Sequence, residues 1–153
     1  MGLTFHPGDL DSADVRALLD FHFADMRALS PRDACHVLTA DSLRDRAISF
    51  WSVRDDGLLA GVGALKAIGA DHGEIKSMRT VPQALGRGVG RALLRYIVDE
   101  ARARGHRRLS LETGSTEPYA AALALYASEG FVPSGPFSDY RPTPFTRFLT
   151  REL

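Results

Sequence analysis

The sequence predicts an α/β fold in which a mixed, twisted central sheet of about six to seven strands is flanked by about four helices. Segments with apolar residues at three- and four-residue steps alternate with segments of β-branched and aromatic composition, and turn-forming residues separate them. The chain has 153 residues, which suits one domain with its own apolar core. Because we find no internal repeat, we treat residues 1–153 as a single domain.

The first third of the chain predicts one strand, one long helix and two shorter helical segments. A strand is expected over residues 2–6, followed by a helix over residues 12–29, where apolar side chains recur at helical spacing. Pro31 follows this helix and interrupts it. Residues 31–38 and 42–45 are expected to form the two shorter helical pieces.

The middle of the chain predicts an antiparallel meander. Residues 47–53 have strand composition, Asp56-Gly57 is typical of a hairpin turn, and residues 58–65 form the partner strand. After a second turn, residues 74–81 are expected to form the central strand, which Pro82 ends.

The rest of the chain predicts further helices and strands in alternation. An amphipathic helix is expected over residues 88–104, with Gly105 as its C-terminal cap. The strand over residues 108–113 should lie parallel to the strand over residues 74–81, because one helix connects them. The remaining expected elements are a helix over residues 117–130, a strand beginning at Phe131-Val132, a proline-rich loop over residues 133–144 and a last strand over residues 145–153.

Composition and charge argue against several classes of protein. Nineteen Lys and Arg residues balance nineteen Asp and Glu residues, so no net field draws the chain to nucleic acid or to an anionic membrane. A single cysteine, Cys35, rules out an internal disulfide, and no C-x-x-C or spaced His pair indicates a metal site. Neither a signal-peptide pattern nor an apolar run of about eighteen residues is present. We expect a cytoplasmic, metal-free protein that binds neither nucleic acid nor membrane.

A glycine-rich turn between a predicted strand and a predicted helix is the clearest functional signal. It contains Gly86, Gly88 and Gly90, and this arrangement offers backbone N–H groups to a phosphate. The dinucleotide-binding pattern G-x-G-x-x-G is absent, because Arg91 and Leu93 stand where its last glycine is required. The nucleoside-triphosphate P-loop is absent as well, because no Lys follows the last glycine.

This turn resembles the acyl-CoA loop of the GCN5-related N-acetyltransferase (GNAT) family, whose pattern is (Arg or Gln)-x-x-Gly-x-(Gly or Ala). Two registers are open. The string Gln83 to Gly88 satisfies the letters, whereas Leu85 to Gly90 better fits the distance from the strand-ending proline to the helix. We prefer the second register, which places Leu85 where the family carries Arg or Gln.

Two further strings follow in the order that the family has them. Residues 109–114 resemble its fifth strand, and residues 122–131 resemble its A-x-x-L-Y-x-x-x-G-F signature. Tyr119 is a departure, because many members carry at this place an Asn that touches the cofactor. The strings over residues 73–80, 109–115 and 136–140 also resemble a small bacterial branch labelled indole-3-acetic acid (IAA) acetyltransferases.

The resemblance implies a GNAT fold and direct transfer of an acetyl group from acetyl-CoA to the primary amine of a small molecule. It also implies which groups contact the cofactor: the backbone of Met78, Arg79 and Thr80 for the pantetheine arm, and the turn residues Gly86, Arg87, Gly88, Val89, Gly90 and Arg91 for the pyrophosphate. Two alternatives stay open, namely an acyl-CoA-binding sensor without catalysis and an acetyltransferase of protein lysines or N-termini.

Three arginines give a separate reason to expect an anion at the turn. Arg87, Arg91 and Arg95 recur at four-residue steps near a helix N-terminus. The helix dipole disfavours each by roughly 0.3–1 kcal/mol, and each like-charge pair costs roughly 0.2–0.5 kcal/mol. A bound phosphate would reverse both effects for Arg87 and Arg91, whereas we expect Arg95 to pair with Asp99.

Glu74 and Tyr126 are the catalytic residues that the resemblance implies. Glu74 matches a family glutamate that acts as general base, and a carboxyl pKa of about 4.3 would need burial or a relaying water to match an ammonium of about 10. Glu112 and His72 are alternatives for this role. Tyr126 matches the family tyrosine that protonates the departing sulfur of CoA.

The acceptor amine is not identified by the sequence. We expect its determinants in residues 30–45 and 133–144. Arg79, together with Tyr140 and Arg141, could hold a carboxylate of the substrate. A homodimer formed through the exposed last strands is compatible with the sequence.

Overall fold

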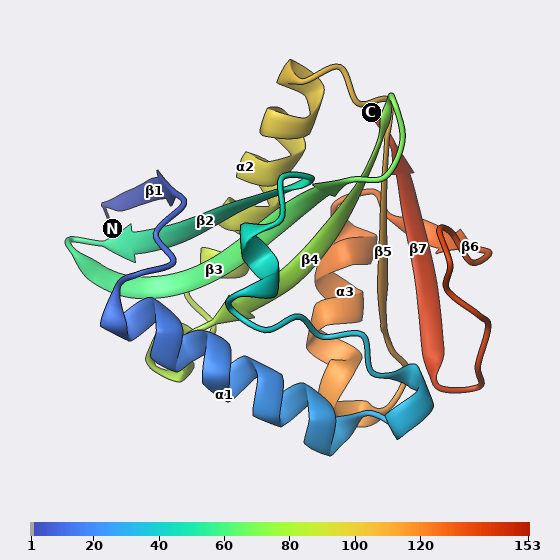
Figure 1. Ribbon diagram of the computed structural model, residues 1–153, viewed down its shortest axis with the longest axis horizontal. Helices are drawn as coiled ribbons and strands as arrows, with labels where there is room; N and C mark the ends of the chain where they lie inside the picture. The colour runs from blue at the N-terminus through green and yellow to red at the C-terminus, as the bar shows by residue number, and fades with distance from the viewer. Residues whose placement is uncertain (1) are drawn as a thin grey trace.

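The computed structural model describes residues 2–153, in which one seven-stranded sheet carries helices on both faces (Figure 1). The strands are β1 (Leu3–Pro7), β2 (Ile48–Asp55), β3 (Leu58–Ala67), β4 (His72–Thr80), β5 (Arg108–Gly114), β6 (Val132–Ser134) and β7 (Thr146–Glu152). The α-helices are α1 (Ala13–Leu29), α2 (Val89–Ala103) and α3 (Ala120–Ser128). Single turns of 3-10 helix are η1 (Arg32–Ala34), η2 (Ser42–Arg44), η3 (Pro82–Ala84) and η4 (Glu117–Tyr119).

The sheet has the order β1-β2-β3-β4-β5-β7-β6, and the predicted mixed α/β class is confirmed. Adjacent strands are antiparallel except β4 and β5, which are parallel as the connecting helix α2 requires. The helix expected over residues 31–38 is only the single turn η1, because so short a segment makes few internal hydrogen bonds. The helix expected from residue 117 begins with η4 and becomes α-helical at Ala120.

Two apolar clusters hold the layers together. One lies between the sheet and α2, where Leu93, Leu94 and Ile97 are almost fully buried, and α3 packs against the same cluster through Leu123 and Leu125. The other joins α1 and η2 to β2 and β3. Figure 1 shows α1 and the segment that follows it in front of the sheet, with α2 behind it.

β4 and β5 stay together over only three residue pairs, from His72 and Arg108 to Glu74 and Ser110. Beyond this point the two strands diverge, and α3 is seen between them (Figure 1). A bulge lies in the free part of β4, where Ser77 has a φ of +56° and the register with β3 shifts. The edge of β4 after Glu74 therefore has no ladder with β5.

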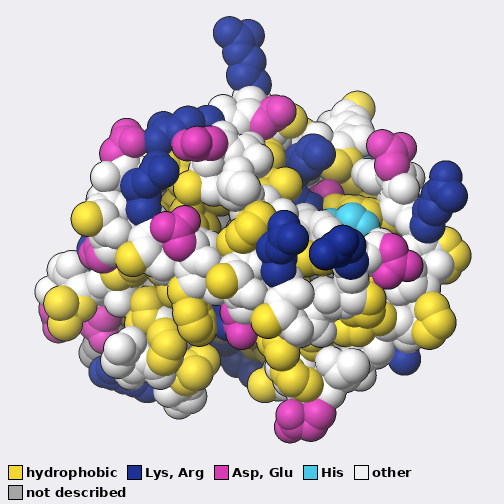
Figure 2. Space-filling view, turned by 60° about the horizontal axis from the view of Figure 1, so that its bottom comes forward, with side chains coloured by type: hydrophobic (Ala, Val, Ile, Leu, Met, Phe, Trp, Pro, Cys, Tyr) yellow, Lys and Arg dark blue, Asp and Glu magenta, His cyan; other side chains and the backbone are white. Residues whose placement is uncertain are grey.

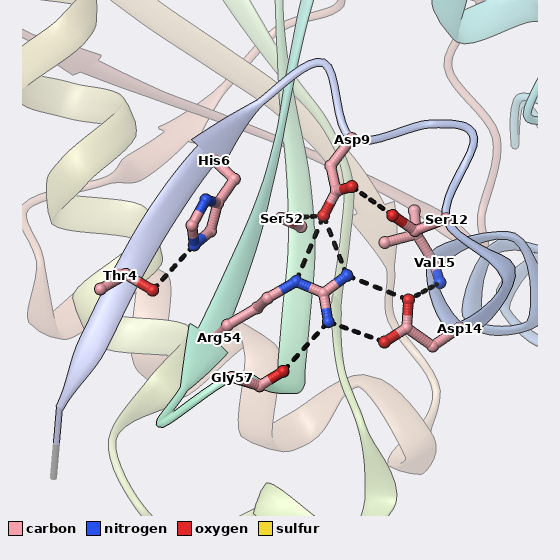
Figure 3. A network of polar contacts seen from close by, with 9 residues as sticks. All are labelled: Thr4, His6, Asp9, Ser12, Asp14, Val15, Ser52, Arg54 and Gly57. Carbon is pink, nitrogen blue, oxygen red and sulfur yellow. Dashed lines mark hydrogen bonds and ion pairs between the residues drawn. The ribbon is translucent and has the colours of Figure 1, made fainter.

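A charged network fixes the start of α1 to the sheet (Figure 3). Arg54 of β2 contacts Asp9 in the turn before α1 at 3.0 Å, and contacts Asp14 in the first turn of α1 at 2.7 Å. Ser52 Oγ donates a further hydrogen bond of 2.6 Å to Asp9. Since α1 forms a wall of the cavity described below, this network helps to position the site.

The same network shifts the pKa values of its carboxyl groups. Burial opposes the ionisation of Asp9, but hydrogen bonds from Ser12, Ser52 and Arg54 together outweigh it and lower the pKa. The hydrogen bond from Arg54 is the main cause of the lowered pKa of Asp14. Both carboxylates are therefore more stable as anions in the folded state than in the unfolded chain.

Replacing Arg54 with Met should lower the free energy of unfolding by about 2–3 kcal/mol, because Asp9 loses the cation that compensates its partial burial. The Arg54 side chain is only 16% exposed. Arg16→Met is a matched control, since the Arg16 side chain is 43% exposed and lies 4.0 Å from Asp41, so its loss should cost less than about 1 kcal/mol. Urea denaturation measures both values, and equal losses would contradict the role given to Arg54.

The pH dependence of that difference gives a second check. A carboxyl group with a lowered folded pKa contributes stability that is complete above its unfolded pKa and is lost as the pH falls through the folded pKa. The difference in unfolding free energy between wild type and Arg54→Met should therefore shrink between about pH 5 and pH 2. A difference that stays constant over this range would show that Asp9 and Asp14 do not carry the effect.

Candidate active site

An open cavity of about 640 Å³ lies where β4 and β5 diverge. The glycine-rich turn lines one end of it, and α1 with the segment after it lines the other. β4, β5 and α3 contribute the walls between these ends. The structure thus brings the turn, the central strand and the helix of the A-x-x-L-Y signature to one cavity, although they are far apart in sequence.

Two of the three glycines of the turn adopt conformations that other residues rarely take. Gly86 and Gly88 have φ angles of +76° and +83°, and a Cβ atom added at either would meet nothing within 4 Å. Backbone conformation, and not crowding, therefore requires glycine at both positions. Gly88 caps α2 without any side-chain hydrogen bond, which leaves the first N–H groups of α2 available to an anion. Leu85 is exposed at the cavity beside them.

Two arginines of α2 share one carboxylate that the sequence did not indicate. Arg91 lies 2.7 Å from Glu129, and Arg95 lies 2.8 Å from the same carboxylate. The expected pairing of Arg95 with Asp99 is therefore wrong, and the row of charges does not by itself require a phosphate. Arg87 is 56% exposed and lies 3.6 Å from Asp55.

The two arginines stabilise Glu129 as an anion. The hydrogen bond from Arg91 is the main cause of the lowered pKa of Glu129, and the charge of Arg95 adds to it. Arg91 also donates a 3.0 Å hydrogen bond to Ser128. This cluster joins the start of α2 to the end of α3, so that two walls of the cavity are held together.

Tyr126 of α3 lines the cavity and is half-buried. Its ring packs edge-on against Phe131, with 5.9 Å between the ring centroids. Burial raises the pKa of Tyr126 to about 12, and the charge of Glu112 contributes to the shift. The phenol therefore stays protonated near neutral pH and can act as a proton donor.

Glu74 is only 2% exposed and is not among the residues that line the cavity. Its Oε2 atom accepts hydrogen bonds from Lys76 Nζ at 3.1 Å and from Tyr140 Oη at 2.6 Å. Lys76 also donates a 2.7 Å hydrogen bond to Tyr140 Oη, which closes a three-residue network. Of these three residues, Lys76 is the one that lines the cavity.

Glu112 of β5 does line the cavity, and its side chain is 18% exposed. Burial is the main cause of its raised pKa, which the charges of His36 and Lys76 partly offset. Glu112 Oε2 lies 3.6 Å from His36 Nδ1, which is beyond hydrogen-bonding distance. Glu112 is therefore a carboxylate at the cavity with no strong ionic partner.

His72 lies outside the cavity, at the start of β4. Its Nε2 atom is 2.7 Å from Ser110 Oγ, and burial followed by the charge of Arg108 lowers its pKa. Of the three residues that the sequence offers as a base, the structure therefore brings only Glu112 to the cavity.

The carboxylate-binding group expected from Arg79, Tyr140 and Arg141 is not formed. Arg79 instead donates to Asp25 at 2.8 Å and to Nδ1 of His22 at 2.9 Å, and both partners belong to α1. Tyr140 is engaged with Glu74 and Lys76, as described above, and Arg141 is exposed outside the cavity lining.

Sequence reasoning did not identify His22 and Asp25 as cavity residues. Burial is the main cause of the lowered pKa of His22, about 4, and the positive charge of Arg79 adds to it. The imidazole is thus neutral and accepts the Arg79 hydrogen bond. The sequence could have indicated His22, because it lies within the apolar stripe of α1, where a titratable side chain is unusual.

Tyr119, where the family often has Asn, lines the cavity and is almost fully buried. Its hydroxyl lies 2.9 Å from Ser30 Oγ, which ties η4 to the end of α1. Gly114 is required beside it, because an added Cβ would come within 2.5 Å of the Tyr119 ring. The aromatic ring therefore fills space next to β5 and closes the α1 end of the cavity.

The described residues give no indication of a membrane helix or a metal site, and their surface charges are mixed. Within residues 2–153, the structure contains no helix that is long and apolar enough to cross a membrane, and no group of three or more potential metal-binding side chains. Figure 2 shows basic and acidic side chains interspersed over the displayed face. On that face the charges do not gather into a patch of one sign.

Known proteins resemble this chain over nearly its whole length. An uncharacterized N-acetyltransferase of Escherichia coli (strain K12), YedL, is 43% identical over 150 residues, which cover 98% of this chain and 94% of the relative. A second uncharacterized N-acetyltransferase, YsnE of Bacillus subtilis (strain 168), is 43% identical over 95% of this chain and 96% of the relative. An IAA acetyltransferase of Azospirillum brasilense is 40% identical over 82% of this chain and 81% of the relative.

Solved structures share the fold. The crystal structure of a protein from Klebsiella pneumoniae superposes on this chain with a TM-score of 0.80 at 27% identity. The match covers 99% of this chain and 97% of the Klebsiella chain. A GNAT family acetyltransferase from Elizabethkingia anophelis, with acetyl-CoA bound, superposes with a TM-score of 0.73 at 18% identity over 99% and 98% of the two chains. The family model of the acetyltransferase (GNAT) family matches residues 15–131, which include both the glycine-rich turn and Tyr126. This chain therefore belongs to the GNAT family of N-acetyltransferases.

Proposed function

We propose that the protein transfers the acetyl group of acetyl-CoA directly to the primary amine of a small molecule within a ternary complex. One observation carries the proposal: a single cavity joins the open edge of β4 and the glycine-rich turn to Glu112 and Tyr126. Such a cavity can hold both reactants together, which is where much of the rate gain of a two-substrate transfer arises.

The residues present suit acetyl-CoA. Met78, Arg79 and Thr80 lie in the part of β4 that has no ladder with β5, and an amide-containing pantetheine arm can add like a strand along this free edge. The pyrophosphate would be held by the turn, formed by Gly86, Arg87, Gly88, Val89, Gly90 and Arg91. When bound, acetyl-CoA supplies the activated acyl group. Because Leu85 offers no polar group, backbone N–H groups should supply most of this grip.

We assign the base to Glu112 in preference to Glu74. Glu112 lines the cavity, and its raised pKa makes the carboxylate a better match for an ammonium proton. Glu74 is bound to Lys76 and Tyr140 and would need a relaying water to reach the amine. Glu112 would accept the proton of the acceptor ammonium and leave the free amine.

Tyr126 would serve as the acid. The phenol stays protonated because its pKa is about 12, and it lines the same cavity as Glu112. As the new carbon–nitrogen bond forms and the carbon–sulfur bond breaks, it would donate its proton to the sulfur, so that the thiol would leave neutral, and the remaining N–H proton that the amine loses would restore the phenol. The two residues therefore handle opposite ends of one transfer, with no covalent enzyme intermediate.

A direct assay tests the activity. The protein is incubated with acetyl-CoA and a panel of small amines, and free thiol is measured over time. Amine-dependent thiol release supports the proposal. Thermal stabilisation by CoA without thiol release from any amine would instead indicate a binding module, and label incorporated only into a protein extract would indicate a protein acetyltransferase.

For Tyr126→Phe, we expect kcat to fall by about 10² or more with little change in the Kd of CoA, because only the proton donor is removed. Tyr96→Phe is a matched control, since Tyr96 stacks on Phe5 and lies outside the cavity lining. Rapid-quench kinetics and calorimetric CoA titration separate the two quantities. Equal losses of kcat and CoA affinity, or no loss, would remove the role of acid from Tyr126.

The pH dependence of kcat/KM distinguishes the two glutamates. In the wild type, kcat/KM should fall as the pH drops through the raised pKa of Glu112, because the protonated carboxyl cannot accept a proton. Glu112→Gln should lose this acidic limb and about 10² in rate, whereas Glu74→Gln should keep the limb. The reverse result would return the role of base to Glu74.

A further inference from the structure

The charged groups of the cavity are nearly all paired within the protein. Among residues 2–153, the charged side chains that line the cavity are Asp25, Lys76, Arg79, Arg91 and Glu112. Each of the three cations has a carboxylate partner: Arg79 lies 2.8 Å from Asp25, Lys76 lies 3.1 Å from Glu74, and Arg91 lies 2.7 Å from Glu129. No cation of the lining is left free to receive an anion at the acceptor end, by which we mean the end of the cavity that α1 and the segment after it line.

Arg79 is particularly well satisfied. Besides its contact with Asp25, it donates to the neutral His22 at 2.9 Å, and its guanidinium lies 5.4 Å from the ring centre of Phe21. Lys76 is likewise buried between Glu74 and Tyr140. A substrate carboxylate at either cation would have to compete with a bonded protein group.

Glu112 is the exception. Lys76 acts on Glu112 through its charge but is bonded to Glu74 at 3.1 Å, and His36, 3.6 Å from Glu112, is charged only when protonated. Near the acceptor, Lys76 and Arg79 are balanced by Glu74 and Asp25, so Glu112 gives this part of the cavity one surplus negative charge. An ammonium entering the cavity gains an ion pair, whereas a carboxylate is desolvated beside a like charge.

Most of the remaining wall at this end is apolar. It is formed by Phe21, Met26, Leu29, Val37, Leu38 and Phe145. These side chains come from α1, the segment after it and the residue before β7. They suit a hydrocarbon or aromatic body attached to the amine.

We propose, on the basis of the acetyltransferase function proposed above, that the acceptor is an apolar monoamine, with one cationic nitrogen, a hydrocarbon or aromatic body and no carboxylate. Glu112 receives the ammonium, and the apolar wall receives the body. Amino acids are rejected because of their charge and not because of their size, since Lys76 and Arg79 are already committed to Glu74 and Asp25.

Matched pairs of acceptors test the proposal. Phenethylamine is compared with phenylalanine, and tryptamine with tryptophan, at one pH of about 8.5, which is nearer to the ordinary pKa of amines than neutral pH is. Thiol release and the mass of the acetylated product are measured for each. We expect kcat/KM to be about 30-fold or more higher for each amine than for its amino acid, because the amino acid must bury an unpaired carboxylate.

A variant tests the physical cause. Asp25→Asn removes the charge that holds Arg79 but keeps the shape, and His22 still accepts the Arg79 hydrogen bond. The preference for amine over amino acid should fall by about tenfold, through a rise in kcat/KM for the amino acid. Asp20→Asn makes the same charge change on an exposed part of α1 outside the cavity and should leave the preference unchanged.

The outcomes separate this proposal from the one on which it rests. Equal or better acetylation of the amino acids overturns the acceptor class and leaves the acetyltransferase function in place. No thiol release with any amine or amino acid overturns both. A folded Asp25→Asn protein, checked by thermal unfolding, that keeps the wild-type preference would show that paired charges do not exclude the carboxylate.

Discussion

The divergence of β4 from β5 is the constraint on which the site depends. The two strands share only three residue pairs, and the bulge at Ser77 lies in the part of β4 that follows. A non-glycine residue at positive φ carries a cost of about 1–2 kcal/mol, so this conformation must be held by its surroundings. The divergence leaves an open strand edge with a cavity beside it, and the apolar core between the sheet and α2 stays intact.

Ion pairs then set the character of that cavity. Glu129 holds the arginines at the start of α2, Asp25 holds Arg79 against α1, and Glu74 holds Lys76. These pairs fix the walls and also neutralise them. Glu112 stands apart from this pattern, and burial leaves it with a raised pKa. One unpaired carboxylate in a neutralised lining accounts for both the proposed base and the proposed preference for a cationic acceptor.

Much of the fold could be predicted, because periodicity and turn residues act locally. The order of strands and helices, the parallel pairing of β4 with β5 and the glycine-rich turn follow from spacing in the sequence. The charge partners could not be predicted in the same way. Glu129 meets Arg95 only because the end of α3 packs beside α2, and the carboxylate position of Glu112 depends on how far β5 departs from β4. The sequence offers both Glu74 and Glu112 as candidates for the base. The structure distinguishes them, because Glu74 is buried and hydrogen-bonded to Lys76 and Tyr140.

Residue-resolved backbone amide exchange with and without CoA tests the central claim most directly, because it reports on the open strand edge and the turn themselves. The account predicts that CoA slows exchange at Met78 to Thr80, where the edge of β4 that faces β5 has no ladder partner, and at Gly86 to Arg91, where no side chain caps the start of α2. Residues at the far edge of the sheet, such as those of β1, should be unaffected. Unchanged exchange in both segments at saturating CoA, or protection elsewhere alone, would contradict it.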